Sequence, residues 1–112
     1  MYKRQISANF GSAVIAPADG VVTFADYLGG YGRAIMVDHG HGISTRYGHL
    51  SSFAVTPGQY IHRGDTIGYV GQSGRSTGPH LHYEVRINDV PVNPYKYLRL
   101  TVAQVGGFTT GE

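Results

Sequence analysis

The sequence predicts an all-β fold, and three observations point to it. Seventeen glycines and five prolines divide the 112-residue chain into short segments. These segments are rich in Val, Ile, Tyr and Thr, the residue types that favour strands. No stretch shows the sustained apolar repeat of about 3.6 residues that is typical of an amphipathic helix. We therefore expect a single antiparallel β-sheet domain whose strands are joined by tight turns.

Each expected strand is a short run of β-favouring residues bounded by turn residues. In chain order, strands are expected at residues 13–16, 21–27, 33–39, 44–49, 60–61, 66–71 and 80–87. Turns are expected between them at residues 16–20, 39–42 and 88–89, where Gly, Asn, Asp and Pro gather. Residues 57–68 are glycine-rich and lack alternation, so they are expected to wrap as a double turn over one sheet edge.

The composition narrows the function classes. With 41% hydrophobic and 14% charged residues, the chain is long enough for one compact core but too short for a second domain. It has no cysteine, so any metal must be held by His, Asp or Glu. The net charge of +2 comes from scattered Lys and Arg, which argues against nucleic-acid binding. No apolar run approaches the roughly 18 residues of a membrane span.

Two histidines open the last expected strand, within the segment GPHLHYEV. In an extended chain alternate side chains share a face, so His80 and His82 project together while Leu81 points to the other side. Such a pair is either a site for metal and proton chemistry or two exposed strand residues. Glu84 should lie on the same face, where it could hold one imidazole in a fixed tautomer.

Five short motifs, in this order along the chain, carry a resemblance to a known protein family. They are APADGVV (16–22), YGHL (47–50), GDTIG (64–68), GQSGRSTGPHLHYEV (71–85) and VNP (92–94). Together they closely resemble the lysostaphin-like, or M23, zinc metallopeptidases, from about residue 6 to residue 98. The resemblance implies an all-β domain of the lysostaphin-like, duplicated hybrid motif type, with a groove across one sheet. Members of that family cut peptide cross-bridges or stems of bacterial peptidoglycan.

The resemblance also implies roles for individual residues. It makes His82 a ligand of the single Zn2+ and places His80 and His49 beside the metal-bound water, as the groups that activate it. These roles fit general chemistry, because zinc lowers the pKa of its bound water to about 7 and an imidazole can take the proton. Tyr31, in the loop 29–32 beside the groove, is expected to touch the substrate.

The other histidines and two aspartates are given structural roles. His39, His41 and His62 are expected to be turn or surface residues. Asp19 and Asp65 lie in turns, where a carboxylate commonly accepts hydrogen bonds from its own backbone.

The chain departs from the family at its start. Aligned on residues 16–20, the two other zinc ligands, the His and Asp of a His-x-x-x-Asp motif, would fall at Met1 and Gln5. One explanation is a natural degenerate member that binds partners instead of cutting. The other is that residues 1–5 are not native: MYKRQ can be back-translated as GTG TAT AAG AGA CAG, which resembles the end of a transposase adapter used in DNA sequencing.

We therefore expect a non-native leader at 1–5, a peptidase-like domain at 6–98 and a loose tail at 99–112. The expected function is that of a zinc endopeptidase domain for peptidoglycan peptides, inactive as written because two ligands are absent. The alternative is a degenerate domain that binds peptidoglycan or activates a partner cell-wall hydrolase. Either would act outside the cytoplasm, in the periplasm, the envelope or the medium.

Overall fold

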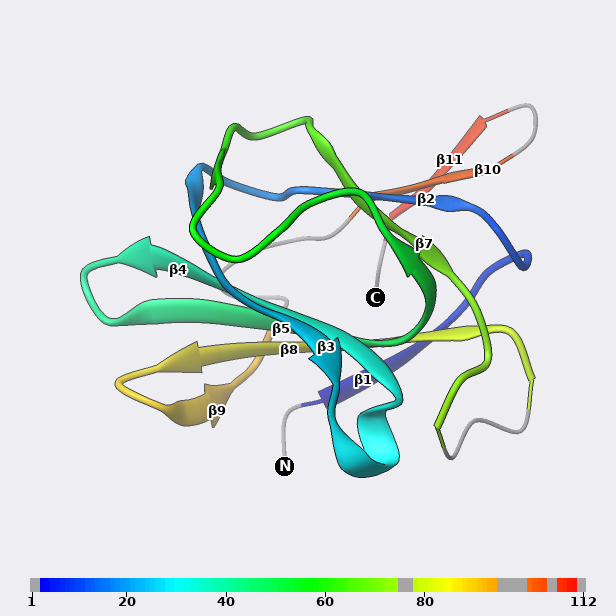
Figure 1. Cartoon of the computed structure of the whole chain (residues 1–112), viewed down its shortest axis with the longest axis horizontal. Helices are drawn as coiled ribbons and strands as arrows, with labels where there is room; N and C mark the ends of the chain where they lie inside the picture. The colour runs from blue at the N-terminus through cyan, green and yellow to red at the C-terminus, as the bar shows by residue number, and fades with distance from the viewer. Residues whose placement is uncertain (1–2, 75–77, 95–100, 105–106, 111–112) are drawn as a thin grey trace.

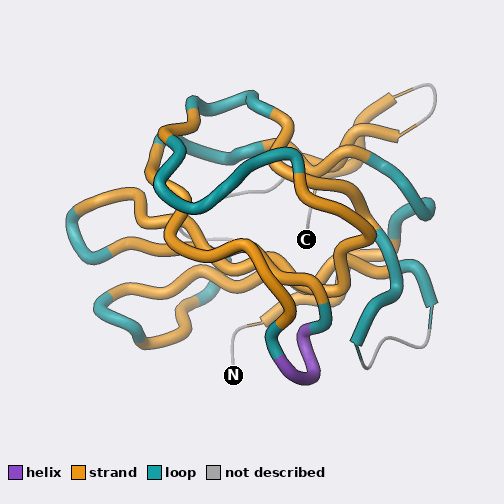
Figure 2. The backbone as a smooth tube through the Cα atoms, viewed as in Figure 1, coloured by secondary structure: helices purple, strands orange, loops and turns teal. Residues whose placement is uncertain are grey.

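The computed structural model describes residues 3–74, 78–94, 101–104 and 107–110. These residues form eleven strands and one short 3-10 turn, η1, at the tip of a hairpin (Figures 1 and 2). The elements are β1 (Lys3–Ser7), β2 (Ala13–Ile15), β3 (Gly20–Tyr27), η1 (Gly29–Tyr31), β4 (Arg33–Gly40), β5 (Ile43–Phe53), β6 (Tyr60–Ile61), β7 (Thr66–Val70), β8 (His80–Ile87), β9 (Val90–Val92), β10 (Thr101–Gln104) and β11 (Gly107–Thr110). The described part has no α-helix, and so none that could cross a bilayer. The all-β prediction is confirmed.

The sheet is antiparallel and branches at β5. Its main path runs β11-β10-β2-β7-β5-β4-β3-β6, while β8 pairs with β5, β1 and β9. The first half of β5, from Ile43 to Gly48, lies against β8, and the second half, from Leu50 to Phe53, lies against β7. In Figure 1, β8 accordingly lies between β5 and β1. Through this branch β8 lies beside β1, from the start of the chain, as well as beside β5 and β9.

All seven expected strands are present, with small differences in length. The largest is in β5, which continues to Phe53 instead of ending near residue 49. The turn predicted at residues 88–89 is also confirmed. Asn88 and Asp89 both have positive φ, as a two-residue type I′ hairpin requires. The 39–42 turn joins β4 to β5, and β6, within the expected double turn, pairs with the edge of β3.

Four strands were not expected from the sequence. β1 and β9 are a polar run and a Pro-containing run, so neither carries an alternating pattern. In place of the expected loose tail, β10 pairs with β2 and with β11. Parts of the 1–5 leader and of the 99–112 tail lie outside the described residues. That residues 1–5 are a sequencing scar stays a prediction.

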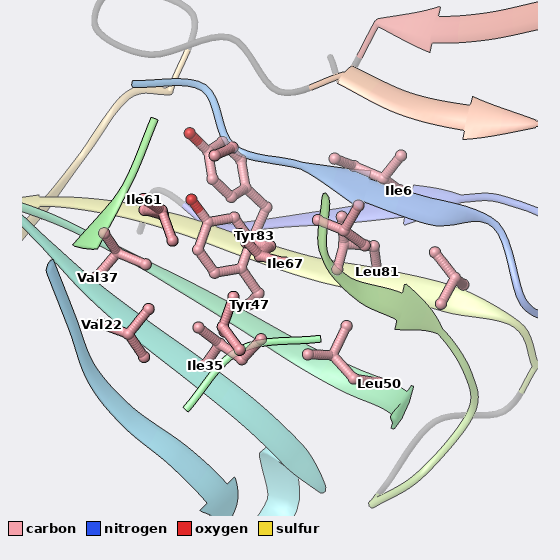
Figure 3. Packing of buried hydrophobic residues seen from close by; sticks show 14 of the residues in the cluster. Ile6, Val22, Ile35, Val37, Tyr47, Leu50, Ile61, Ile67, Leu81 and Tyr83 are labelled. Carbon is pink, nitrogen blue, oxygen red and sulfur yellow. The ribbon is translucent and has the colours of Figure 1, made fainter. Parts of the chain in front are cut away.

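The core lies on the inner side of the curled sheet. Its largest fully buried side chains come from five strands, β4 to β8, and are Tyr47, Tyr83, Ile35, Leu50, Ile61, Ile67 and Leu81. Figure 3 shows these side chains meeting in one cluster, with the rings of Tyr47 and Tyr83 side by side at a centroid distance of 5.5 Å. Burial of this apolar surface holds β8 in place, because alternate β8 residues face the core.

One histidine has a larger role than expected. His39 is half-buried: its Nδ1 donates to the Asp19 carbonyl at 2.7 Å, and its Nε2 contacts the Thr45 hydroxyl at 2.8 Å. The Thr45 hydroxyl contacts the hydroxyl of Tyr47 at 2.7 Å, and both of these residues are fully buried. His39 thus ends a hydrogen-bond chain that satisfies two buried hydroxyls, so the turn-or-surface expectation understates it.

Candidate functional site

His82 is held by a carboxylate on its own strand. Its Nε2 lies 2.8 Å from Oε2 of Glu84, two residues along β8 on the same face. A carboxylate can only accept, so Nε2 carries the proton, and in the neutral imidazole the lone pair is on Nδ1. Both side chains are buried, His82 at 6% and Glu84 at 2% exposure. The role suggested for Glu84 by its spacing is thus supported by this contact.

The Glu84 carboxylate collects donors from three residues. Besides His82, the Tyr31 hydroxyl donates to Oε2 at 2.5 Å, and Arg86 donates to Oε1 from Nε at 3.1 Å and from a terminal nitrogen at 3.0 Å. Burial alone would raise the pKa of Glu84, but the hydrogen bonds from these partners outweigh it and hold the pKa at about 2. Glu84 is therefore a buried anion at neutral pH.

His49 faces His82 from the branch point of β5. The two rings meet edge to face, with centroids 5.8 Å apart. The Nδ1 of His49 donates to the Ser73 carbonyl at 2.7 Å, which leaves the lone pair of the neutral ring on Nε2. Burial lowers the pKa of His49; the Ser73 bond opposes this, and the nearby His82 and His80 lower the pKa further. The net shift keeps His49 neutral and able to accept a proton at pH 7.

The backbone of His49 is also unusual. Its φ is 61°, in the left-handed region that non-glycine residues seldom adopt. The residue lies where β5 leaves β8 for β7, and the pairing register with β7 shifts just beyond it. This irregularity turns the imidazole toward β8, and such conformations are typical of functional positions.

His80 begins β8, next to Gly71 in an isolated bridge. Its Nδ1 is buried and has no hydrogen-bond partner among the described residues. A buried polar nitrogen without a partner costs stability, and such atoms often mark functional positions. The structure thus brings His49 and His82 into ring contact and places His80 on the same strand as His82.

Tyr31 lies over His82, with ring centroids 4.9 Å apart. Its approach depends on Gly48, where an added Cβ would lie 3.1 Å from the Tyr31 ring and 3.3 Å from the Cβ of His82. Burial and the Glu84 carboxylate raise the pKa of Tyr31, while Arg46 opposes the shift. Because the Tyr31 hydroxyl is already bonded to Glu84, this side chain braces the site, and its expected contact with substrate stays a prediction.

The strand β1 completes one side of the site. It pairs with β8 so that Gln5 lies opposite His82 and Ser7 opposite His80. This register puts position 5 beside His82, where the sequence alignment expected the family's Asp. Among the described residues no group of three His, Asp or Glu side chains is arranged to hold a metal ion.

Several supporting residues carry no signal in the sequence. Ser73 was not singled out, yet its carbonyl fixes the His49 tautomer and its hydroxyl donates to Leu50 O at 2.6 Å. Arg86, whose guanidinium donates to Glu84, was likewise not singled out. The aspartates behave nearly as expected: Asp65 accepts from the backbone of His62 in its own turn, whereas Asp19 accepts from Arg63 in a neighbouring turn.

Comparisons with known proteins identify relatives of this chain. The chain is 56% identical over 84 residues to the DD-carboxypeptidase/endopeptidase Mpg of Neisseria meningitidis serogroup B, covering 75% of this chain and 19% of Mpg. It is 41% identical over 93 residues to the murein hydrolase activator EnvC of Escherichia coli, covering 83% of this chain and 22% of EnvC. The chain thus spans about a fifth of the length of these relatives.

Solved structures show the same fold. The catalytic domain of the antimicrobial peptidase lysostaphin from Staphylococcus simulans superposes with a TM-score of 0.82 at 30% identity, covering 87% of this chain and 77% of that one. A zinc-containing peptidase from Vibrio cholerae gives a TM-score of 0.74 at 36% identity, covering 76% of this chain and 26% of that one. The profile of Peptidase family M23 matches residues 4–94. With most of its length matched by that profile, the chain belongs to peptidase family M23.

Proposed function

We propose that this domain comes from a cell-envelope enzyme that hydrolyses peptide bonds of peptidoglycan, acting outside the cytoplasm. The observation that carries the proposal is the pair of buried imidazoles, His49 and His82, each with its tautomer fixed by its own acceptor, Ser73 O and Glu84. A purely structural domain has no need for two such rings in contact. The relatives support the reaction class, since Mpg is named an endopeptidase and lysostaphin a peptidase.

The residues present do not make the family's zinc site. A catalytic zinc takes three protein donors and leaves a fourth position open. His82 offers one donor, with the carboxylate-bound geometry typical of metal-ligating histidines. The position opposite it is Gln5, and position 1 is Met, so two anchors of the site are not metal-binding residues. The chain as written is therefore proposed to be inactive.

The other side chains of the site can still fill two roles that peptide hydrolysis requires: accepting a proton from the attacking water and bonding to the oxygen that gains charge. His49 is neutral and presents its Nε2 lone pair, so it can take a proton from a water that attacks a peptide carbonyl. His80, at the start of the strand that carries His82, is the group proposed to bond to the oxygen that gains charge. Tyr31 and Glu84 fix the ring of His82 between them.

The test restores the two absent ligands. Met1→His and Gln5→Asp are introduced together behind a short N-terminal extension, so that another residue precedes position 1. The restored chain is expected to bind about one zinc per chain and to release peptides from purified sacculi. The matched control adds His80→Ala, which should keep the metal and lose turnover. A restored chain that folds but binds no zinc would refute the assignment of positions 1 and 5.

A second function is favoured by one specific observation. The absence of two ligands is what a non-catalytic member would show, and EnvC, a murein hydrolase activator by name, is 41% identical to this chain. On this reading the domain binds peptidoglycan or a partner hydrolase. The two functions separate in one experiment: the chain as written should sediment with sacculi or stimulate an amidase, and His80→Ala should leave that property unchanged. Loss of binding in His80→Ala would argue against the scaffold.

A further inference from the structure

The two imidazoles of the site are oriented from two different loops. His49 donates from Nδ1 to the carbonyl of Ser73, in the loop 71–74 that follows β7. His82 has the ring of Tyr31 against it, with centroids 4.9 Å apart, and Tyr31 lies in η1 at the tip of the β3–β4 hairpin. These loops are far apart in the sequence, so the relation between the two imidazoles depends on how the loops meet.

The hydroxyl of Ser73 joins its loop to two strands at once. It donates to the carbonyl of Leu50 at 2.6 Å and accepts from the backbone N–H of Arg33 at 3.0 Å. Arg33 and Leu50 are register partners in the pairing of β4 with β5, and Leu50 directly follows His49. The hydroxyl therefore bridges these strands where their pairing ends, one residue from the imidazole that the Ser73 carbonyl holds.

Two glycines bring the loops into backbone contact. Gly32 follows η1 and Gly74 follows Ser73, and their φ angles are 68° and 71°, in the left-handed region that favours glycine. A Cβ added at Gly32 would lie 2.5 Å from the nitrogen of Gly74, and a Cβ added at Gly74 would lie 2.7 Å from the carbonyl oxygen of Gly30. Real Cβ atoms do not come this close to other atoms. The loops thus touch through their main chains, which cannot rotate away as a side chain can.

The η1 side of this contact reaches the carboxylate that holds His82. Tyr31 directly precedes Gly32, and its hydroxyl donates to Oε2 of Glu84 at 2.5 Å. The same oxygen accepts from Nε2 of His82 at 2.8 Å. Main-chain hydrogen bonds make the turn one unit, since Leu28 N–H donates to Gly32 O at 2.8 Å and Tyr31 N–H to Leu28 O at 2.9 Å. A displacement at Gly32 would therefore move Tyr31 with it.

We propose that Ser73 is a positioning residue that sets the two imidazoles relative to each other. Its carbonyl fixes the tautomer of His49. Its hydroxyl, together with the contact between Gly32 and Gly74, fixes the loop that carries Tyr31. The inference rests on the proposed function, because hydrolysis of a peptide bond requires a fixed relation between the two rings, whereas burial of the loops does not. Ser73 is given no part in proton transfer.

The test measures tautomers in the chain as written, so it requires neither metal nor turnover. Long-range 1H–15N spectra of the chain with labelled histidines are recorded at about pH 8, where an ordinary imidazole is neutral. His49 should be protonated on Nδ1. In Ser73→Ala, Leu50 O and Arg33 N–H lose their partner, so the loop should shift. The ratio of the two His49 tautomers should then change roughly fivefold toward the form protonated on Nε2, as expected when one hydrogen bond weakens.

Two further serine variants separate positioning from stability. Ser73→Thr keeps the hydroxyl and should keep the tautomer ratio of the unsubstituted chain. Ser51→Ala is the matched control, because the Ser51 hydroxyl also donates from β5 to a backbone carbonyl, that of Tyr69 at 3.3 Å. It should leave the His49 ratio unchanged even where it lowers the melting temperature. A residue that only stabilised the fold would not move the ratio in Ser73→Ala either.

Gly74→Ala tests the contact between the loops. Its Cβ would press on the carbonyl of Gly30, so the η1 turn should be displaced. The ring signals of His82 should move together with those of His49, because Tyr31 lies against the His82 ring. A Gly74→Ala chain in which the His82 signals stay in place would overturn the coupling of the two rings.

Three other results would overturn the role of Ser73: an unchanged His49 ratio in Ser73→Ala, an equal change in Ser51→Ala, or a changed ratio in Ser73→Thr. If Ser73→Ala does not fold, the unsubstituted chain decides. A scalar coupling through the hydrogen bond between His49 Nδ1 and the Ser73 carbonyl carbon is expected, and its absence would refute the proposal. The enzyme assignment fails separately: if the tautomers respond as expected but the restored chain cuts no sacculi, Ser73 still orients the rings and the hydrolytic proposal falls.

Discussion

Replacing Glu84 with Gln should remove a large, pH-dependent part of the stability of the domain. The substitution keeps the shape of the side chain but puts an amide where a carboxylate accepts from His82, Tyr31 and Arg86. The pKa of Glu84 falls from 4.5 to about 2 on folding. A shift of this size, at about 1.36 kcal/mol per unit, corresponds to about 3 kcal/mol. Because Glu84 is 2% exposed, solvent does not reduce this figure appreciably.

The sign of the pH dependence follows from the direction of the shift. A carboxyl whose pKa is lower in the folded state contributes stability above its unfolded pKa and loses it as pH falls through its folded pKa. The difference in unfolding free energy between the wild type and Glu84→Gln should therefore be about 3 kcal/mol at pH 6–7 and shrink between pH 4.5 and pH 2. Urea unfolding followed by circular dichroism at several pH values measures it.

Asp26→Asn is the matched control. Asp26 is exposed, and its carboxylate accepts one hydrogen bond, from the backbone of Tyr27. That variant should change stability by less than about 1 kcal/mol at any pH. A Glu84→Gln protein with a small and pH-independent loss would show that the carboxylate is not the buried anion described above.

Two further substitutions test the packing around the site. Thr45→Val removes the hydroxyl between His39 and Tyr47 and leaves the buried Tyr47 hydroxyl unpaired, so we expect a loss of about 2–4 kcal/mol in urea unfolding; a loss no larger than that of Tyr47→Phe would contradict the chain of bonds. Gly71→Ala places a Cβ 2.5 Å from the Ser51 backbone nitrogen, which cannot yield cheaply, and should cost about 1–3 kcal/mol. An unchanged melting temperature for Gly71→Ala would refute that close approach.

Local patterns were sufficient to predict most of the strands. The run 80–87 combines β-favouring residues with period-two alternation, and 33–39 contains a short continuous apolar run. The turn at Asn88 and Asp89 has residues that adopt positive φ. β1 was missed because its five residues are mostly polar, and they become a strand through pairing with β8. That pairing is long-range information, which no window along the chain contains.

Some residues of the candidate site could likewise be predicted from the sequence, and others could not. His80, His82 and Glu84 share a face by simple alternation, so their grouping could be predicted. His49 could be placed near them only by resemblance, because its left-handed backbone and the branch in β5 are tertiary features. Ser73 accepts the hydrogen bond from His49 through its carbonyl, and Arg86 donates to Glu84 through its guanidinium. Neither contact could be predicted from residue type or spacing.

The branching of β5 has a consequence for how such a domain can vary. Since β4 pairs along most of β5 while β8 and β7 pair with its first and second halves, an inserted residue in either half would reverse inward and outward side chains against β4 and against the strand that pairs with that half. The register of β5 thus determines both which side chains enter the core and where the imidazole of His49 lies. The loops between the other strands do not carry this constraint, and η1, between β3 and β4, lies in such a loop. Changes in the loops can therefore alter the surroundings of the imidazoles while the spacing of His49 and His82 stays fixed by the pairing of β5 with β8.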